Sequence, residues 1–182
     1  ESDKKPTLEY NGKTYALANV HMHVPSEHAV DGMRYPAEVH LVHEKVLARP
    51  DGEKDYLVQG FFLEHADKAK EGGKLLSKAK RGMIPEMFDS LIEPAVATTE
   101  GTPLALQMSK APFETSKFWV YPGSLTTPPY SADVTWVVYA DPVYSSALKT
   151  FASSAQPNAR SLQSSVANAE VLTFAAKTDS KS

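Results

Sequence analysis

The sequence predicts an α+β domain built on a mainly antiparallel central β-sheet with short peripheral helices. Short apolar runs with alternating polar residues recur along the chain, and Asn-Gly and Asp-Gly pairs, typical of hairpin turns, stand between them. At 182 residues, with 42% hydrophobic and 9% aromatic residues, the chain can bury a sizeable core. We expect one domain over residues 1–182, with flexible polar tails at 1–7 and 177–182.

The expected strands follow in order along the chain. Residues 8–24 form short strands around Asn11-Gly12, and residues 35–43 alternate as a strand that pairs antiparallel with them. Further strands are predicted at 56–63, 104–108, 117–121, 133–139 and 170–175. Helices are predicted at 64–81, where Gly72-Gly73 interrupts the helical composition, at 85–91 and at 143–154.

Charge and composition exclude several classes of protein. The net charge is -3 and the 19 basic residues are scattered, so we expect no nucleic-acid partner. No run approaches the ~20 apolar residues that cross a bilayer. The chain begins at Glu1 rather than Met, and we expect a soluble, processed chain, secreted, periplasmic or in an organelle lumen rather than cytosolic. Without cysteine, any zinc must be held by histidine and carboxylate.

Three histidines have the spacing of a metal site. His21 and His23 stand two apart, so on a strand they share a face, and a hairpin can bring His40 beside them. Glu38 and Asn19 each lie two residues before one of these histidines, where they could accept the second ring N–H and orient the ring. The alternative reading is that these histidines are ordinary hydrogen-bonded residues and that Glu38 is a half-exposed strand residue.

Two separate segments carry a family resemblance. Residues 20–43 (VHMHVPSEHAVDGMRYPAEVHLVH) resemble the zinc-binding segment of α-class carbonic anhydrases, in the form frequent in bacterial, plant and algal members. Residues 121–129 (YPGSLTTPP), followed by Val134-Thr135-Trp136, match the second signature of that family. The similarity runs from about residue 8 to residue 163, and the part of the family's domain upstream of it is not in this chain.

The resemblance implies roles for individual residues. His21, His23 and His40 match the zinc ligands, and Thr126 matches the residue that accepts a hydrogen bond from the attacking hydroxide and passes its own proton to Glu27. The substrate pocket would be formed by Val42, Val58, Leu125, Thr127 and Trp136. The Asn158 segment would orient His23, while Asn19 replaces a more usual Gln. His28 and Tyr121 match a buried structural pair near Glu38.

The implied function is zinc-dependent, reversible hydration of carbon dioxide to bicarbonate and a proton. The alternative is a carbonic-anhydrase-like structural or binding subunit of a larger complex with little or no activity, and a general zinc hydrolase comes third. No histidine is nominated as the proton shuttle. A partner chain or a second copy is expected to cover the face left by the upstream region.

Overall fold

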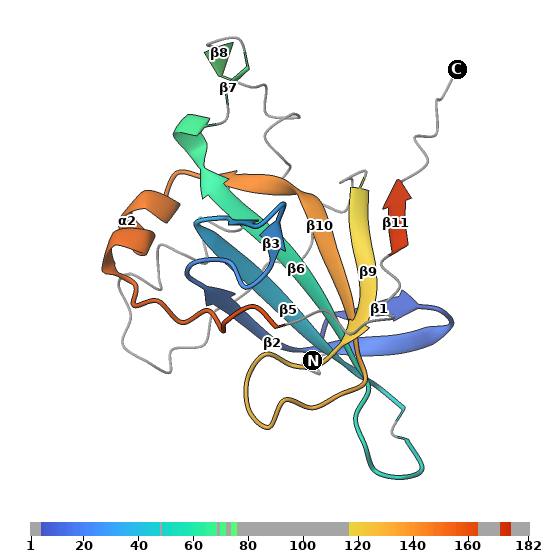
Figure 1. Cartoon of the computed structure of the whole chain (residues 1–182). Coiled ribbons are helices and arrows are strands. Elements are labelled where there is room, and N and C mark those ends of the chain that lie inside the picture. The colour runs from blue at the N-terminus through green and yellow to red at the C-terminus, as the bar shows by residue number, and fades with distance from the viewer. Residues whose placement is uncertain are drawn as a thin grey trace, which may run out of the picture.

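The computed structural model describes residues 5–47, 49–68, 70–71, 74–75, 117–163 and 172–175. This part is dominated by a curled seven-stranded sheet with the spatial order β1-β2-β5-β6-β10-β9-β11 (Figure 1). In chain order its strands are β1 (Thr7–Tyr10), β2 (Lys13–His23), β5 (Ala37–Lys45), β6 (Tyr56–His65), β9 (Lys117–Gly123), β10 (Val134–Ser145) and β11 (Leu172–Ala175). Neighbours pair antiparallel except β6 and β10, which run parallel. The predicted mainly antiparallel sheet is therefore confirmed.

The first hairpin forms where the turn residues predict it. Asn11 and Gly12 both take positive φ angles, 48° and 70°, which these two residue types adopt most readily. Strand β1 already begins at Thr7, which pairs with Ala16 of β2. The last residue of the predicted tail 1–7 is thus part of the sheet.

The two central strands β5 and β6 are buried on both faces. One face packs Leu41 and Phe61 into a core that also contains Leu148 of helix α2 (Leu148–Ser154). The opposite face carries Val42 and Val58 into a second apolar cluster. Because side chains alternate along a strand, the second face is also that of His40 and Glu38.

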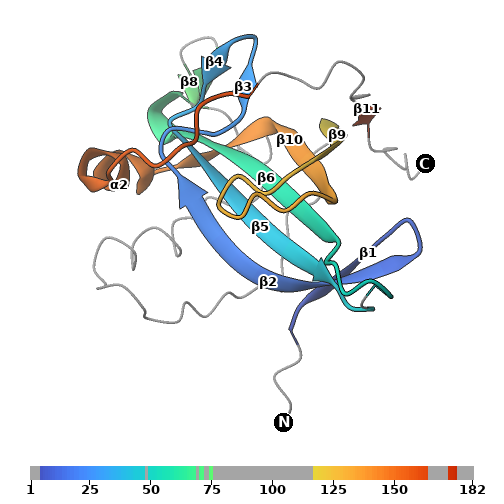
Figure 2. The same cartoon turned by 60° about the horizontal axis from the view of Figure 1, so that its bottom comes forward.

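A small hairpin, β3 (Ala29–Val30) and β4 (Met33–Arg34), connects β2 to β5. Figure 2 shows it at one end of the sheet, beside the segment that follows α2. The predicted Asp31-Gly32 turn joins its two strands, with φ angles of 51° and 78°. This hairpin holds the loop at residues 24–28 close to the end of β2.

Two helix predictions are wrong in the described residues. Glu64 and His65 were expected to begin a helix, but they end β6 and pair in parallel with Tyr144 and Ser145. They are followed by a short 3-10 helix, η1 (Ala66–Lys68), and by two further strands, β7 (Lys70–Glu71) and β8 (Lys74–Leu75). Residues 143–145 were also expected to be helical, but β10 resumes its pairing with β6 after a bulge and continues to Ser145.

Helix α2 therefore begins five residues later than expected, where the Ser145 hydroxyl accepts a hydrogen bond from the Leu148 N–H. The expectations for residues 76–81, 85–91, 104–108, 170–171 and 177–182 lie outside the described residues. Among the helices of the described part, none is long and apolar enough to cross a bilayer.

Candidate metal centre

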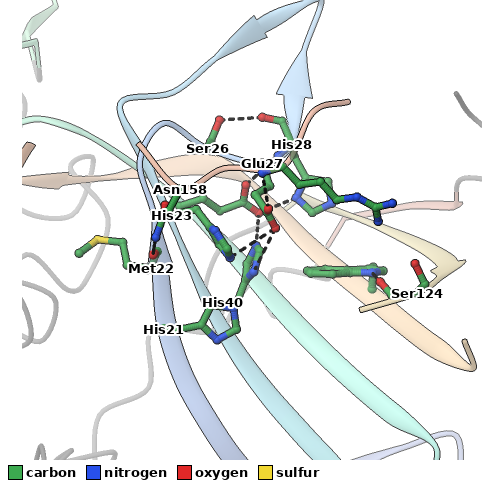
Figure 3. Close-up of polar contacts among 12 residues, drawn as sticks. His21, Met22, His23, Ser26, Glu27, His28, His40, Ser124 and Asn158 are labelled. Atoms are coloured by element: carbon green, nitrogen blue, oxygen red, sulfur yellow. Dashed lines mark hydrogen bonds and ion pairs between the residues drawn. The ribbon is translucent and has the colours of Figure 1, made fainter. Parts of the chain in front are cut away.

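The register of β2 against β5 assembles the histidine cluster. His21 lies opposite His40 and His23 lies opposite Glu38, all on one face of the sheet. The ring centres are 5.0 Å apart for His21 and His23, 5.2 Å for His21 and His40, and 4.8 Å for His23 and His40. Figure 3 shows the three rings gathered together with Glu27 beside them. One ligand nitrogen from each lies within 4.8 Å of the others.

Two of the three rings are oriented by hydrogen bonds. The Asn19 side-chain oxygen accepts from Nδ1 of His21 at 2.6 Å, and Oε1 of Glu38 accepts from Nε2 of His40 at 2.9 Å. Both oxygens act as acceptors, so the bonded nitrogens carry the protons. Nε2 of His21 and Nδ1 of His40 are left with free lone pairs, as metal ligation requires.

Several buried polar atoms of the cluster have no hydrogen-bond partner among the described residues. They are Nδ1 of His40, both ring nitrogens of His23 and Oε2 of Glu27. Leaving such an atom buried and unpaired costs ~1–3 kcal/mol, and a bound cation would remove this cost for Nδ1 of His40 and for one ring nitrogen of His23. Three imidazole nitrogens are a donor set that suits zinc in a cysteine-free chain. The residues present therefore fit a zinc ion.

Burial keeps two of the three histidines, His21 and His23, in the neutral form. It lowers the pKa of His21 to about 4, with the neighbouring His40 and His23 adding to the effect. It also lowers the pKa of His23, again assisted by His40, while the backbone of Asn158 acts in the opposite direction. Neutral imidazole is the form that coordinates a metal, so neither ring must lose a proton at neutral pH before binding.

A second triple, His28, Glu38 and His40, also has ligand-like geometry, but the ring nitrogens that face Glu38 are already hydrogen-bonded to it. Oε1 of Glu38 accepts from Nδ1 of His28 at 2.6 Å as well as from His40, while Oε2 accepts from the His28 backbone N–H at 2.9 Å. The other ring nitrogen of His28 is hydrogen-bonded to the Tyr121 hydroxyl. Burial alone would raise the pKa of Glu38, but its hydrogen bonds from His28 and His40 hold it well below the usual range. This triple is a hydrogen-bond network that supports His40.

Glu27 approaches the cluster from the loop after β2. Its Oε1 accepts from the Arg160 backbone N–H at 2.8 Å, and its Oε2 lies 3.3 Å from Nε2 of His23 and 4.0 Å from Nδ1 of His40. Arg34 fixes this arrangement, because its guanidinium donates to the carbonyl of Ser26 at 2.7 Å and to that of Arg160 at 2.9 Å. The loop that carries Glu27 and the segment that holds it are thereby joined.

A cavity of about 150 Å³ opens beside the histidines. It is lined by Asn19, His21, His40, Val42, Val58, Leu125, Thr126, Thr127 and Trp136. The Trp136 indole N–H donates to the Ser124 carbonyl at 3.1 Å, so its polar atom is satisfied by the backbone. The wall is mostly apolar and has polar groups at the histidine side and at the two threonines, which suits a small, weakly polar molecule.

A profile of the eukaryotic-type carbonic anhydrase family matches residues 2–169. The chain belongs to this family. It is 38% identical over 138 residues to putative carbonic anhydrase 3 of Caenorhabditis elegans, covering 72% of this chain and 50% of that protein. Mouse carbonic anhydrase 7 is 34% identical over 145 residues, covering 71% and 49%. The chain spans about half the length of these curated relatives.

Among solved structures, the α-carbonic anhydrase of Thermovibrio ammonificans with the inhibitor sulfanilamide is similar, with a TM-score of 0.65 and 28% identity. The match covers 88% of this chain and 64% of that one. The α-carbonic-anhydrase-like fold predicted from the sequence is thus confirmed. Dioscorin complexed with ascorbate has the same fold, with a TM-score of 0.68 at only 20% identity.

Thr126 and Asn158 are two further residues to which the carbonic anhydrase resemblance assigns a role. Thr126 lies in the cavity wall with His21 and His40, but no hydrogen bond joins it to Glu27 in the described part of the chain. The Asn158 side chain accepts from the Val24 N–H at 2.9 Å and donates to the Met22 carbonyl at 3.1 Å. The side chain therefore anchors the end of β2, while the Asn158 backbone interacts with the ring of His23 and raises its pKa.

The sequence analysis missed Arg34 and Arg160. Arg160 supplies the backbone N–H that holds Glu27, and its side chain stacks over the Tyr130 ring at 4.2 Å. Neither role leaves a local signal, because the partners are 133 and 126 residues apart in sequence. His28 does lie between Tyr121 and Glu38, where the family resemblance places it.

Proposed function

We propose that this chain carries the zinc site of a carbonic anhydrase and catalyses the reversible hydration of carbon dioxide to bicarbonate and a proton. The observation that carries the proposal is the histidine cluster itself. Three rings converge, two have their outer nitrogens occupied by Asn19 and Glu38, and the inward nitrogens are unpaired. Family membership supplies the reaction class, and a site of three histidines leaves a coordination position for water.

Zinc bound by His21, His23 and His40 would lower the pKa of a bound water and so supply a nucleophile at neutral pH. The protein's own contribution is orientation. Glu38 and Asn19 hold their rings in the tautomer that turns a lone pair inward, and the Glu38 carboxylate makes His40 a more basic ligand.

The cavity would receive carbon dioxide against its apolar wall, next to His21 and His40. This wall offers no strong hydrogen-bond donor to a polar molecule, because the Trp136 N–H already donates to the Ser124 carbonyl. Its residues are Val42, Val58, Leu125 and Trp136. Thr126 is placed to accept a hydrogen bond from the attacking oxygen if it donates its own proton to Glu27.

The bicarbonate formed carries a negative charge, which the apolar wall cannot solvate, so water readily displaces it. A proton must then leave the site. The cavity lining contains no histidine besides His21 and His40 among the described residues. His43 is buried and its Nδ1 donates to the Leu41 carbonyl, so it is no candidate for proton transfer to solvent.

A carbonic-anhydrase-like structural or binding subunit is the second candidate function. One observation favours it: no hydrogen bond joins Thr126 to Glu27 in the described part of the chain. In that case a partner chain or a second copy would cover the sheet and the activity would be low. We also propose that this chain works outside the cytosol, in a secreted, periplasmic or organelle-lumen location.

The two candidates are separated by measuring zinc content and carbon dioxide hydration on the same samples. The proposal expects one zinc per chain and stopped-flow hydration well above that of His40→Ala, which loses a ligand on the central strand. One zinc per chain with hydration no faster than His40→Ala in every sample would establish the binding subunit instead. Ester hydrolysis without hydration would indicate a general zinc hydrolase.

A further inference from the structure

Gly60 occupies the position on β6 directly opposite His40. The β5–β6 register pairs these two residues, and Glu38 is the next residue of β5 on the same face. A side chain at Gly60 would therefore project between the ligand and the carboxylate that orients it. A glycine in the middle of an apolar strand weakens it and often marks a close approach of another group.

The space above Gly60 is filled by one oxygen atom. A Cβ at this position would lie 2.8 Å from Oε1 of Glu38, closer than real Cβ contacts allow. The next neighbours, Cγ2 of Val138 at 3.5 Å and Cδ2 of His40 at 3.8 Å, are at ordinary contact distances. The φ angle of Gly60 lies outside the left-handed region, so the backbone itself would accept alanine. The crowding is thus specific to the Glu38 carboxylate.

That oxygen has no free direction in which to retreat. Oε1 accepts from His28 and from His40, and Oε2 accepts from the His28 backbone N–H. The Glu38 side chain is fully buried, and His40 is 1% exposed. A shift of Oε1 away from a new methyl group must lengthen at least one of these bonds, and the bond to His40 is the one that fixes the metal-facing nitrogen.

We infer that Gly60 is a positioning residue of the metal centre, required so that one carboxylate oxygen of Glu38 can serve His28 and His40 together. The inference rests on the proposed zinc site, although not on catalysis at it. Gly60 acts through Glu38 and touches neither metal nor substrate. Its role is to leave room for the acceptor that sets the tautomer and orientation of His40.

The first test is the zinc affinity of Gly60→Ala, measured by competition with a chromophoric chelator. Loss of a group that orients a ligand weakens metal binding by roughly ten- to a hundredfold, and we expect a change in that range. Val120→Ile is the matched control, since it also adds a methylene to a buried strand position but lies in the core cluster on the other face of the sheet. The control should keep its zinc affinity within about threefold. Equal affinities of Gly60→Ala and the unchanged chain would overturn the inference.

A double variant distinguishes positioning from general overpacking. Glu38→Asp retracts the carboxylate from Gly60, so adding Gly60→Ala to Glu38→Asp should change the zinc affinity by less than about threefold. A further tenfold loss in that background would show that the methyl group acts through other neighbours. If Gly60→Ala alone fails to fold, recovery of the folded state on adding Glu38→Asp supports the inference, and no recovery contradicts it.

The metal-free protein gives a readout that is independent of enzymatic activity. In the unchanged chain the imidazole ¹⁵N spectrum should show His40 protonated at Nε2, and Gly60→Ala should shift or broaden that signal while the His21 signal stays in place. A Gly60→Ala spectrum with an unmoved His40 signal would refute the role. A chain that binds zinc without hydrating carbon dioxide would refute the proposed function and leave this inference standing.

Discussion

The metal centre has one part on strands β2 and β5 and another part on loops, and hydrogen bonds fix the strand part more fully than the loop part. On the strands, Asn19 and Glu38 hold His21 and His40 at 2.6 and 2.9 Å. On the loops, Glu27 and Thr126 are near the histidines, but no hydrogen bond joins them in the described residues, and Oε2 of Glu27 faces His23 at 3.3 Å instead. Side chains thus orient two of the three ligand rings, whereas the two groups that would orient the attacking oxygen are not connected.

The two parts differ because their side chains are positioned in different ways. Strand residues are placed by the β2–β5–β6 ladders, in which register decides which side chains face one another. Loop residues depend on contacts between distant segments, such as Arg34 with Arg160. Metal binding and catalysis should respond separately to substitution.

The largest expected effect is on the loop side. Thr126→Ala should lower kcat/KM for carbon dioxide hydration by about 10²–10³-fold, because it removes one hydrogen bond that orients the reacting oxygen. Zinc content should stay at one per chain, since Thr126 contacts no ligand-orienting group. Stopped-flow hydration and metal analysis check this together. A Thr126→Ala chain as active as the unchanged one would mean that the threonine is only part of the cavity wall.

On the strand side, Glu38→Gln should weaken zinc binding by about ten- to a hundredfold. The amide cannot accept hydrogen bonds at both of its ends, so either the His28 backbone N–H or the two imidazole N–H groups lose their acceptor. Chelator competition measures the dissociation constant, with the thermal melt of the metal-free protein recorded alongside. An unchanged zinc affinity would show that the network around Glu38 does not support the metal site.

Asn19→Ala should have a smaller effect of the same kind, near the tenfold end of that range. Its hydrogen bond to His21 is exposed to solvent, so water can take over the acceptor role, unlike at the buried Glu38. The same chelator titration applies. If Asn19→Ala weakened zinc binding more than Glu38→Gln, the ranking of the two orienting groups by burial would be wrong.

The smallest effect is expected far from the site, at Asp55. Hydrogen bonds from Lys45 and Arg49 lower the pKa of this carboxyl against the opposing effect of burial. A lowered pKa contributes stability above the unfolded value of about 3.9, and this contribution is lost as pH falls through the folded value. Asp55→Asn should therefore cost at most about 1 kcal/mol at pH 7 and nothing in strong acid. Urea titrations at both pH values check this, and a changed zinc affinity would be unexpected.

The sequence was most informative where local periodicity determines structure. Alternation along the strands was enough to predict that His21, His23 and His40 share a face with Glu38, and the pairing in the structure agrees. Helix prediction from local composition was wrong at Glu64–His65 and at residues 143–145, where parallel pairing between β6 and β10 extends both strands instead. Gly60 carried a readable signal, a glycine inside an apolar strand, whose meaning required the position of Glu38.

The most direct test of the central claim is X-ray absorption spectroscopy of the zinc-loaded chain. Three strand-organised histidines, with no fourth ligand grouped with them in the described part of the chain, predict three imidazole nitrogens and one light atom from solvent that exchanges with added anions. The signal of one imidazole should be lost in His40→Ala. A zinc coordinated by fewer than three imidazoles, or one closed by a fourth protein ligand that anions cannot displace, would contradict the account.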